Sequence, residues 1–148
     1  MKIASKTIPQ SQWINEKLHP SWQQNFEVDQ LLVDTKTSYQ HLQIFENATF
    51  GKVMMLDGVT QTTERDEFIY HEMLAHIPMV AHGSATSVLV IGGGDGGIIR
   101  EVLKHPKLSS VTMVEIDSGV VEYSKRYMPS LSQGAFENNK VKLHIADA

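Results

Sequence analysis

The chain has 148 residues, of which 41% are hydrophobic and 20% charged, a composition typical of a soluble globular protein rather than a disordered one. Its formal net charge of −4 argues against nucleic-acid binding, which calls for a basic face. The sequence has no cysteine, which excludes disulfides and thiolate metal sites, and no apolar run long enough to span a membrane. We therefore expect a cytoplasmic protein.

The N-terminal part of the sequence predicts antiparallel β-structure. We interpret residues 1–27 as a loosely held lead-in whose two tryptophans fill core positions. The pattern of residues 31–62 is that of β-strands, and Asp57-Gly58 predicts a two-residue hairpin because a type I′ turn needs positive φ at both positions. We therefore predict an N-terminal β-hairpin domain with its lead-in over residues 1–65.

Two glutamines, Gln40 and Gln61, stand near the ends of predicted strands. Strand positions of this kind most often carry solvent-facing polar side chains, and the sequence alone favours that interpretation. Each amide also offers a donor and an acceptor that could bind a ribose or an amine.

A helix is predicted next. Thr63-x-x-Asp66 resembles a capping box and opens a helix that we expect to run to about Ile77, where Pro78 ends it. One face of this helix is apolar and carries Ile69, Met73 and Ile77.

The histidines of this helix do not predict a metal site. His71 and His76 are five residues apart, whereas zinc-binding helices place histidines at i and i+4. Tyr70 and His71 could line a cleft, although a helix with an exposed histidine and a half-buried tyrosine usually has no such role.

A glycine-rich loop follows the apolar run Val88–Ile91 and leads directly into a helical pattern. Gly92, Gly94 and Gly97 satisfy G-x-G-x-x-G, in which the glycines allow a tight turn, close ligand approach and strand–helix packing, respectively. The pattern is typical of a parallel strand at the rim of a doubly wound sheet, and both dinucleotide and adenosine-type ligands use it.

Asp95 narrows the choice of ligand. A carboxylate inside this loop would repel the phosphates of a dinucleotide and attract an ammonium or sulfonium group. Asp is also a good helix N-cap residue, so Asp95 could simply cap the following helix. The two roles are compatible, and the sequence leaves both open.

Residues 66–148 predict the first part of a Rossmann-like, nucleoside-binding α/β domain. We expect strands at 87–91, 111–116 and 141–146, helices at 96–104 and 117–128, and a polar loop at 130–140. Asp95, Glu115 and Asp147 each follow or end one of the three strands. Because ligands bind beyond the carboxyl ends of parallel strands, these acids predict an adenosine-containing ligand with a cationic tail.

At this point the sequence resembles the spermidine synthases, which are polyamine aminopropyltransferases. The resemblance rests on Tyr39-Gln40, on the block from Leu56 to Glu72, on the glycine loop with Arg100-Glu101-Val102, and on residues 114–117. It implies an N-terminal antiparallel β domain followed by the first half of a Rossmann-like parallel sheet of the S-adenosylmethionine methyltransferase type.

The resemblance also implies a reaction and a set of binding residues. The family transfers the aminopropyl group of decarboxylated S-adenosylmethionine, a co-substrate, to putrescine, giving spermidine and methylthioadenosine, and needs no prosthetic group or metal. We expect a homodimer or homotetramer. Donor and nucleoside contacts are expected from Gln40, Gly92, Gly94, Glu115, Asp147 and Ala148, and aminopropyl or polyamine contacts from Gln61, Tyr70, His71 and Asp95.

The sequence departs from the family in two places. Asp147-Ala148 stands where the family usually has Asp-Gly, a change between small residues that we expect to matter little. The Asp-x-x-Asp-Pro loop that carries the family's general base is not found, so we expect a truncated piece with negligible turnover and an unpaired edge at its first parallel strand.

Three alternatives are compatible with the sequence. An S-adenosylmethionine-dependent methyltransferase shares the glycine loop and the acid after the second strand. A nicotinamide dehydrogenase is the next alternative, since dinucleotide ligands also use this glycine-rich loop. A non-catalytic module would use the β domain for self-association and keep only a vestigial pocket.

Overall fold

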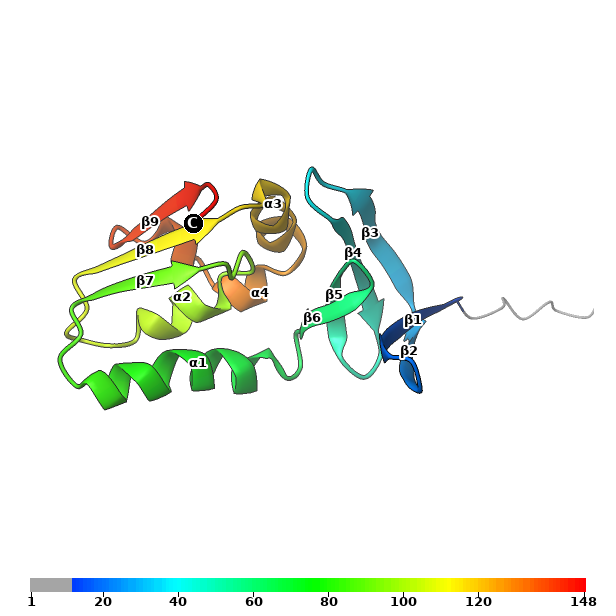
Figure 1. Ribbon diagram of the computed structural model, residues 1–148, viewed down its shortest axis with the longest axis horizontal. Helices are drawn as coiled ribbons and strands as arrows, with labels where there is room; N and C mark the ends of the chain where they lie inside the picture. Colours follow the sequence, from blue (N-terminus) through cyan, green and yellow to red (C-terminus); the bar gives the residue numbers. More distant parts are fainter. Residues whose placement is uncertain (1–11) are drawn as a thin grey trace, which may run out of the picture.

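The computed structural model describes residues 12–148 as an antiparallel β part joined to a parallel α/β part (Figure 1). The β part contains a hairpin, β1 (Gln12–His19) with β2 (Trp22–Val28), and a four-stranded antiparallel sheet. The strands of that sheet follow chain order: β3 (Gln30–Lys36), β4 (His41–Asn47), β5 (Gly51–Leu56) and β6 (Val59–Thr63).

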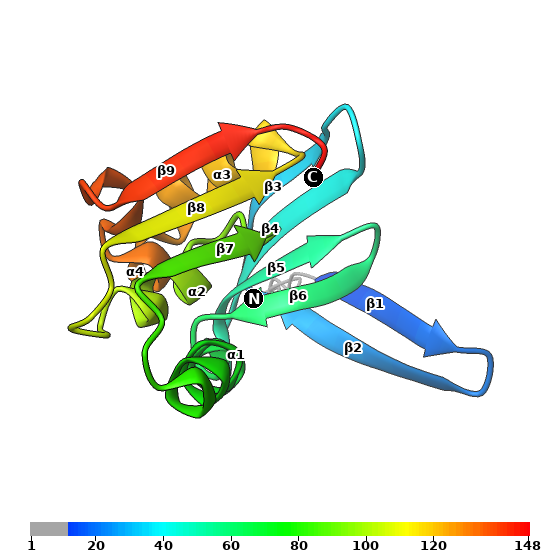
Figure 2. The same ribbon diagram turned by 60° about the vertical axis from the view of Figure 1, so that its left-hand side comes forward.

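The lead-in prediction is wrong from residue 12 onward, and its first eleven residues lie outside the described part. Trp13 and Trp22 are 56% and 49% exposed, so the expectation that both tryptophans fill the core is also wrong. Side chains alternate along a strand, and on β1 and β2 the inward positions go to Glu16 and Phe26 while Trp13 points outward. Trp22 stands beside the turn, at the tip of the hairpin that projects from the molecule in Figure 2.

The predicted turn between β5 and β6 is confirmed. Asp57 and Gly58 have φ values of 50° and 75°, as a type I′ turn requires. The Asp57 side chain accepts a hydrogen bond from the backbone N–H of His41 (2.8 Å), which ties the turn to the start of β4.

The helix α1 (Glu67–His82) runs past the predicted stop at Pro78 and ends at Gly83, which has a left-handed backbone. Proline fits helical φ, and its cost is a lost hydrogen bond and a clash with the preceding turn. The apolar residues Ile69, Met73 and Ile77 share a face as predicted, and this face is more than half exposed. The buried positions of α1 are His71 and Ala75.

The α/β part contains β7 (Ser87–Ile91), α2 (Gly97–Val102), β8 (Ser110–Glu115), α3 (Ser118–Tyr127) and β9 (Val141–Ile145), with the strands parallel in the order β7-β8-β9. The predicted polar loop at 130–140 is mostly wrong. It contains the end of a short helix, α4 (Pro129–Ser132), and a 3₁₀ turn, η1 (Ala135–Glu137), because Leu131 and Ala135 are buried anchors. The expected fold class is confirmed.

The helices lie on one side of the parallel sheet, and the near face in Figure 2 carries no helix of the described residues. Leu89 and Ile91 of the edge strand β7 are 60% and 68% exposed on that bare side. None of the helices in residues 12–148 combines the length and apolar character needed to cross a membrane.

Three apolar clusters hold the elements together. One lies between α1, α2 and the parallel sheet, and another between the β1–β2 hairpin and the four-stranded sheet. The third joins the opposite side of that sheet to α3 and α4; its buried members are Val33, Leu42, Ile44, Met54, Val120, Met128 and Leu131. The two parts of the chain therefore share a core.

Candidate donor-binding site

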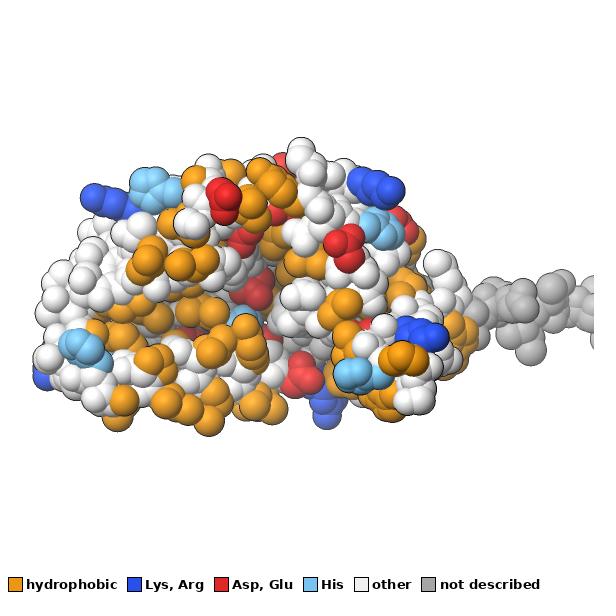
Figure 3. Space-filling view, in the orientation of Figure 1, with side chains coloured by type: hydrophobic (Ala, Val, Ile, Leu, Met, Phe, Trp, Pro, Cys, Tyr) orange, Lys and Arg blue, Asp and Glu red, His pale blue; other side chains and the backbone are white. Residues whose placement is uncertain are grey.

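A cavity of about 370 Å³ opens between the β part and the α/β part. Figure 3 shows the molecule hollowed at this place, with acidic side chains on the walls. The cavity collects seven of the ten predicted site residues: Gln40, Gln61, Tyr70, His71, Gly94, Asp95 and Glu115. Gly93 and apolar side chains of β5, α1, the end of β7, α2, the residue after β8 and α3 complete the lining.

Three predicted residues do not line this cavity. Gly92 lies just outside it, and Gly93 takes the lining position instead. Asp147 and Ala148 are exposed and follow the end of β9. β9 pairs with β8, whose terminal Glu115 lines the cavity, so Asp147 and Ala148 follow the next strand of the sheet.

The glycines of the loop have separate steric roles. Gly92, Gly93 and Gly96 take left-handed φ values of 78°, 84° and 81°, which form the tight turn. A Cβ on Gly94 would lie 2.8 Å from Val120 Cγ1 and 3.1 Å from Glu115 Oε2. A Cβ on Gly97 would lie 2.3 Å from the His71 ring, so this glycine permits α2 to pack on α1 and not, as predicted, on a strand.

Asp95 fixes the start of α2 and contacts α1. Its Oδ1 accepts a hydrogen bond from the Gly97 N–H at 2.7 Å, while Gly96 occupies the N-cap position itself. Its Oδ2 lies 3.2 Å from His71 Nε2, and the side chain is 12% exposed. Asp95 therefore helps to cap α2 through the Gly97 N–H, and cation binding by Asp95 remains a prediction.

His71 is almost fully buried, with 1% of its side chain exposed, whereas Tyr70 is 58% exposed. This reverses the expectation of an exposed histidine and a half-buried tyrosine. His71 Nδ1 lies 2.5 Å from Glu67 Oε2. Burial by itself would lower the pKa of His71, but the carboxylates of Asp95 and Glu67 outweigh it and hold that pKa above its usual value of 6.5.

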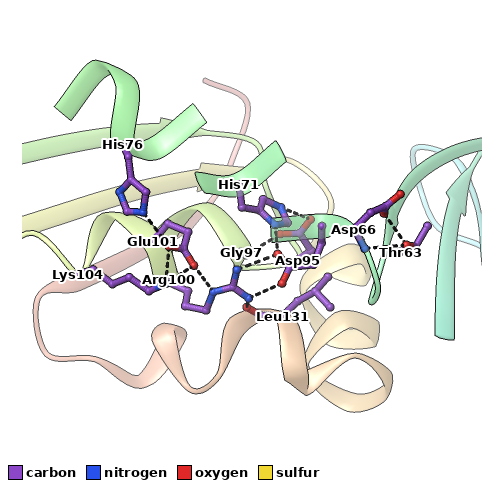
Figure 4. A network of polar contacts seen from close by, with 11 residues as sticks. Thr63, Asp66, His71, His76, Asp95, Gly97, Arg100, Glu101, Lys104 and Leu131 are labelled. Carbon is purple, nitrogen blue, oxygen red and sulfur yellow. Dashed lines mark hydrogen bonds and ion pairs between the residues drawn. The ribbon is translucent and has the colours of Figure 1, made fainter. Parts of the chain in front are cut away.

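Behind His71 lies an ion-pair network that sequence reasoning missed, shown in part in Figure 4. Arg100, 9% exposed, donates two hydrogen bonds to Glu67, at 2.9 Å and 2.8 Å, and others to Glu101 and to the Leu131 carbonyl. Burial would raise the pKa of Glu67, but Arg100 and His71 hold it below its usual value. The available signal was the i, i+4 spacing of Glu67 and His71.

A second polar group ties the β part to the side of the cavity formed by the end of β8. Glu115 ends β8 as predicted, is 7% exposed, and accepts a hydrogen bond from the Asp117 N–H at 3.0 Å. Asp117 caps α3 as predicted, and its contacts with the β part were not predicted: it accepts hydrogen bonds from Gln40 Nε2 at 2.8 Å and Thr37 Oγ1 at 2.7 Å. Gln40 therefore faces the cavity and α3, not solvent. Gln61 is exposed at the cavity mouth.

The remaining histidines of this region pair with each other. His76 lies 2.9 Å from His105 and 3.1 Å from Glu101. Within residues 12–148, no group of three or more His, Asp or Glu side chains is arranged to hold a metal ion.

Comparisons with known proteins decide the family. A family model described as the spermine/spermidine synthase domain matches residues 67–148, and one described as the spermidine synthase tetramerisation domain matches residues 12–64. The chain belongs to the spermidine synthase family. It spans about half the length of the curated relatives it matches.

Individual relatives support this assignment. The chain is 57% identical over 135 residues to a polyamine aminopropyltransferase of Ruegeria sp. (strain TM1040), with 91% of this chain and 48% of the relative covered. Against the enzyme of that name from Sodalis glossinidius the identity is 58% over 138 residues, covering 93% and 48%. The crystal structure of spermidine synthase from Thermotoga maritima matches with a TM-score of 0.88 at 37% identity, covering 97% of this chain and 52% of that one.

A further similar structure holds a bound ligand. Spermidine synthase in complex with the transition-state analogue AdoDATO matches with a TM-score of 0.88 at 38% identity, covering 96% of this chain and 50% of that chain.

Proposed function

We propose that this chain supplies the donor-binding part of a spermidine synthase, which transfers the aminopropyl group of decarboxylated S-adenosylmethionine to putrescine. The observation that carries the proposal is the Asp95 carboxylate, placed in the glycine loop on the cavity wall. A carboxylate there attracts the sulfonium and ammonium groups of the donor and repels a pyrophosphate or a second carboxylate. The donor acts as a co-substrate, and the proposal needs no prosthetic group.

The assignment of roles follows the place of each residue in the fold. Glu115 stands at the carboxyl end of β8, where an acid can accept hydrogen bonds from ribose hydroxyls, and Gly94 lines the cavity next to it. We assign the donor nucleoside to Gln40, Gly92, Gly94, Glu115, Asp147 and Ala148. We assign the aminopropyl and polyamine groups to Gln61, Tyr70, His71 and Asp95.

The reaction explains why a carboxylate is useful at this position. Attack of the acceptor nitrogen on the carbon next to sulfur forms a C–N bond and breaks the C–S bond, whose electron pair goes to sulfur. The products are spermidine, a proton and the neutral thioether methylthioadenosine. Holding the donor's ammonium at Asp95 fixes the aminopropyl chain for in-line attack. We assign no general base to this chain, so binding is the property to test.

The test is titration calorimetry of the chain with decarboxylated S-adenosylmethionine, S-adenosylmethionine and methylthioadenosine. We expect the decarboxylated donor to bind at least about tenfold more tightly than S-adenosylmethionine, because one repelled carboxylate costs of the order of 1.4 kcal/mol or more. Asp95→Asn should reduce this preference, and Glu115→Gln should weaken all three ligands. Equal affinity for the two sulfonium compounds would favour the methyltransferase alternative.

We also propose that the protein assembles as a homodimer or homotetramer and works in the cytoplasm. The match of residues 12–64 to a tetramerisation domain supports self-association, as do the exposed Leu18 and Trp22 on the hairpin. Light scattering tests this, since a species of only 16.6 kDa at all concentrations would contradict it.

A further inference from the structure

We propose that Glu67 and Arg100 are positioning residues, which act through the imidazolium of His71 to orient the Asp95 carboxylate toward the cationic tail of the donor. The inference rests on the proposed function and adds two residues to it. Neither Glu67 nor Arg100 lines the 370 Å³ cavity, although Glu67 lines an adjoining hollow, and the contacts of both residues lead to the cavity through His71.

The contacts of His71 indicate that its ring carries a positive charge. Its ring nitrogens face two different carboxylates, with Nδ1 2.5 Å from Glu67 Oε2 and Nε2 3.2 Å from Asp95 Oδ2. A neutral imidazole can donate from one nitrogen only and would point a lone pair at the other carboxylate. The contacts therefore call for a ring that is protonated on both nitrogens, and the raised pKa of His71 agrees with this.

The protonated His71 ring helps to orient the Asp95 carboxylate. The Gly97 N–H holds Oδ1 at 2.7 Å, and His71 holds Oδ2, so the carboxylate is fixed at two points. The His71 ring is itself confined, because the Cα of Gly97 lies so close that a Cβ there would be 2.3 Å from the ring. A fixed carboxylate loses little orientational freedom when it binds a cation.

Glu67 and Arg100 in turn hold the His71 ring in place. Glu67 is held by the two parallel hydrogen bonds from Arg100, a bidentate geometry that fixes both groups. Arg100 is held in turn by Glu101 and by the Leu131 carbonyl (2.6 Å), and Lys104 balances the remaining charge of Glu101.

Positive and negative charges alternate along the four side chains that lead from the α1–α2 interface to the cavity. Arg100 is positive, Glu67 negative, His71 positive and Asp95 negative, so the four groups sum to zero. An ammonium or sulfonium at Asp95 continues the alternation. Without the Glu67 charge, His71 would either leave an excess positive charge beside the ligand or lose a proton and one of its two contacts.

The experiment compares two ligands and two variants of the unmodified 148-residue chain. Decarboxylated S-adenosylmethionine carries the cationic tail, whereas methylthioadenosine has the same nucleoside without it. Glu67→Gln should lower the affinity ratio between these ligands about tenfold, the size of one charged hydrogen bond, and should change methylthioadenosine binding less than about twofold. Glu72→Gln, which removes the same charge from an exposed position of α1, should leave the ratio unchanged.

A second measurement does not depend on a variant that folds. In the unliganded, unmodified chain, nitrogen NMR of the His71 ring should show both nitrogens protonated at pH 6.5. In the binding experiment, a third variant, Arg100→Lys, keeps the charge and should retain part of the affinity ratio between the two ligands. A His71 ring that is neutral at this pH, or an unchanged ratio in Glu67→Gln, would overturn the positioning role. Failure of the unmodified chain to bind either ligand would instead overturn the proposed function, and the NMR result would still decide the state of His71.

Discussion

His71 joins two helices and the glycine loop, and its burial between carboxylates makes the stability of the chain depend on pH. Its folded pKa is raised above 6.5, so its contribution is complete below pH 6.5 and is lost as the pH rises through the raised value. The folded pKa values of Glu67 and Glu101 are lowered from 4.5, so their contributions are present above pH 4.5 and are lost as the pH falls through the lowered values.

These signs predict a maximum of the melting temperature between pH 4.5 and 6.5, with a decline on either side. Scanning calorimetry across that range measures it. His71→Gln should weaken the alkaline decline and leave the acid decline in place. An alkaline decline of the same size in His71→Gln and in the unmodified chain would contradict this assignment.

The residues of the site differ in how far sequence could predict them. Asp95 and Glu115 follow from the glycine loop and the strand ends, because main-chain topology fixes where those positions fall. Glu67 is an ordinary acidic residue in a first helical turn, and its partner Arg100 is 33 positions away. Their meeting depends on how α1 packs on α2, which local patterns do not encode.

At the level of elements, the β5–β6 turn offers a clean test of backbone conformation. Gly58 has φ of 75°, and a Cβ added there would meet no atom within 4 Å. Gly58→Ala should therefore lower the free energy of unfolding by about 1 kcal/mol through the left-handed backbone alone, as measured by urea denaturation.

The matched variant is Gly58→Asn, because asparagine tolerates the left-handed region better than alanine. It should lose less stability than Gly58→Ala. Equal losses would show that the glycine is needed for a reason other than its backbone angle.

The strands and helices with strong periodicity were predictable, and the exceptions have tertiary causes. The β1–β2 hairpin escaped prediction because it carries a charge inward: Glu16 is 2% exposed and accepts hydrogen bonds from Thr60 N–H (2.7 Å), Thr60 Oγ1 and Gln24 Nε2. A buried carboxylate breaks the expected alternation. Similarly, α1 continues through Pro78, where a stop signal is only a local preference.

At the level of the whole molecule, the cluster shared by the four-stranded sheet and α3–α4 predicts that both parts unfold together. Both tryptophans lie in the β1–β2 hairpin, whereas the described helices all lie between residues 67 and 137. Tryptophan fluorescence therefore reports on the β part and helical circular dichroism on the α/β part. Because the two parts share a cluster, the two urea transitions should coincide.

Leu131→Ala probes this coupling directly, because Leu131 is 1% exposed on the α4 side of the shared cluster. This variant should lower the free energy of unfolding by about 2–5 kcal/mol and should shift the two urea transitions equally. A fluorescence transition that stays in place while the dichroism transition moves would show two independent domains divided near residue 65.

The strand order also bears on how the polypeptide reaches this fold while it is being made. Throughout residues 12–148, every hydrogen-bonded strand pair joins strands that are adjacent in the sequence. Within these residues, β2, β4, β5, β6, β8 and β9 each pair with the strand synthesised just before them. Such local pairing lowers the contact order and favours rapid, stepwise folding during translation, from the hairpin through the meander to the nucleoside-binding sheet.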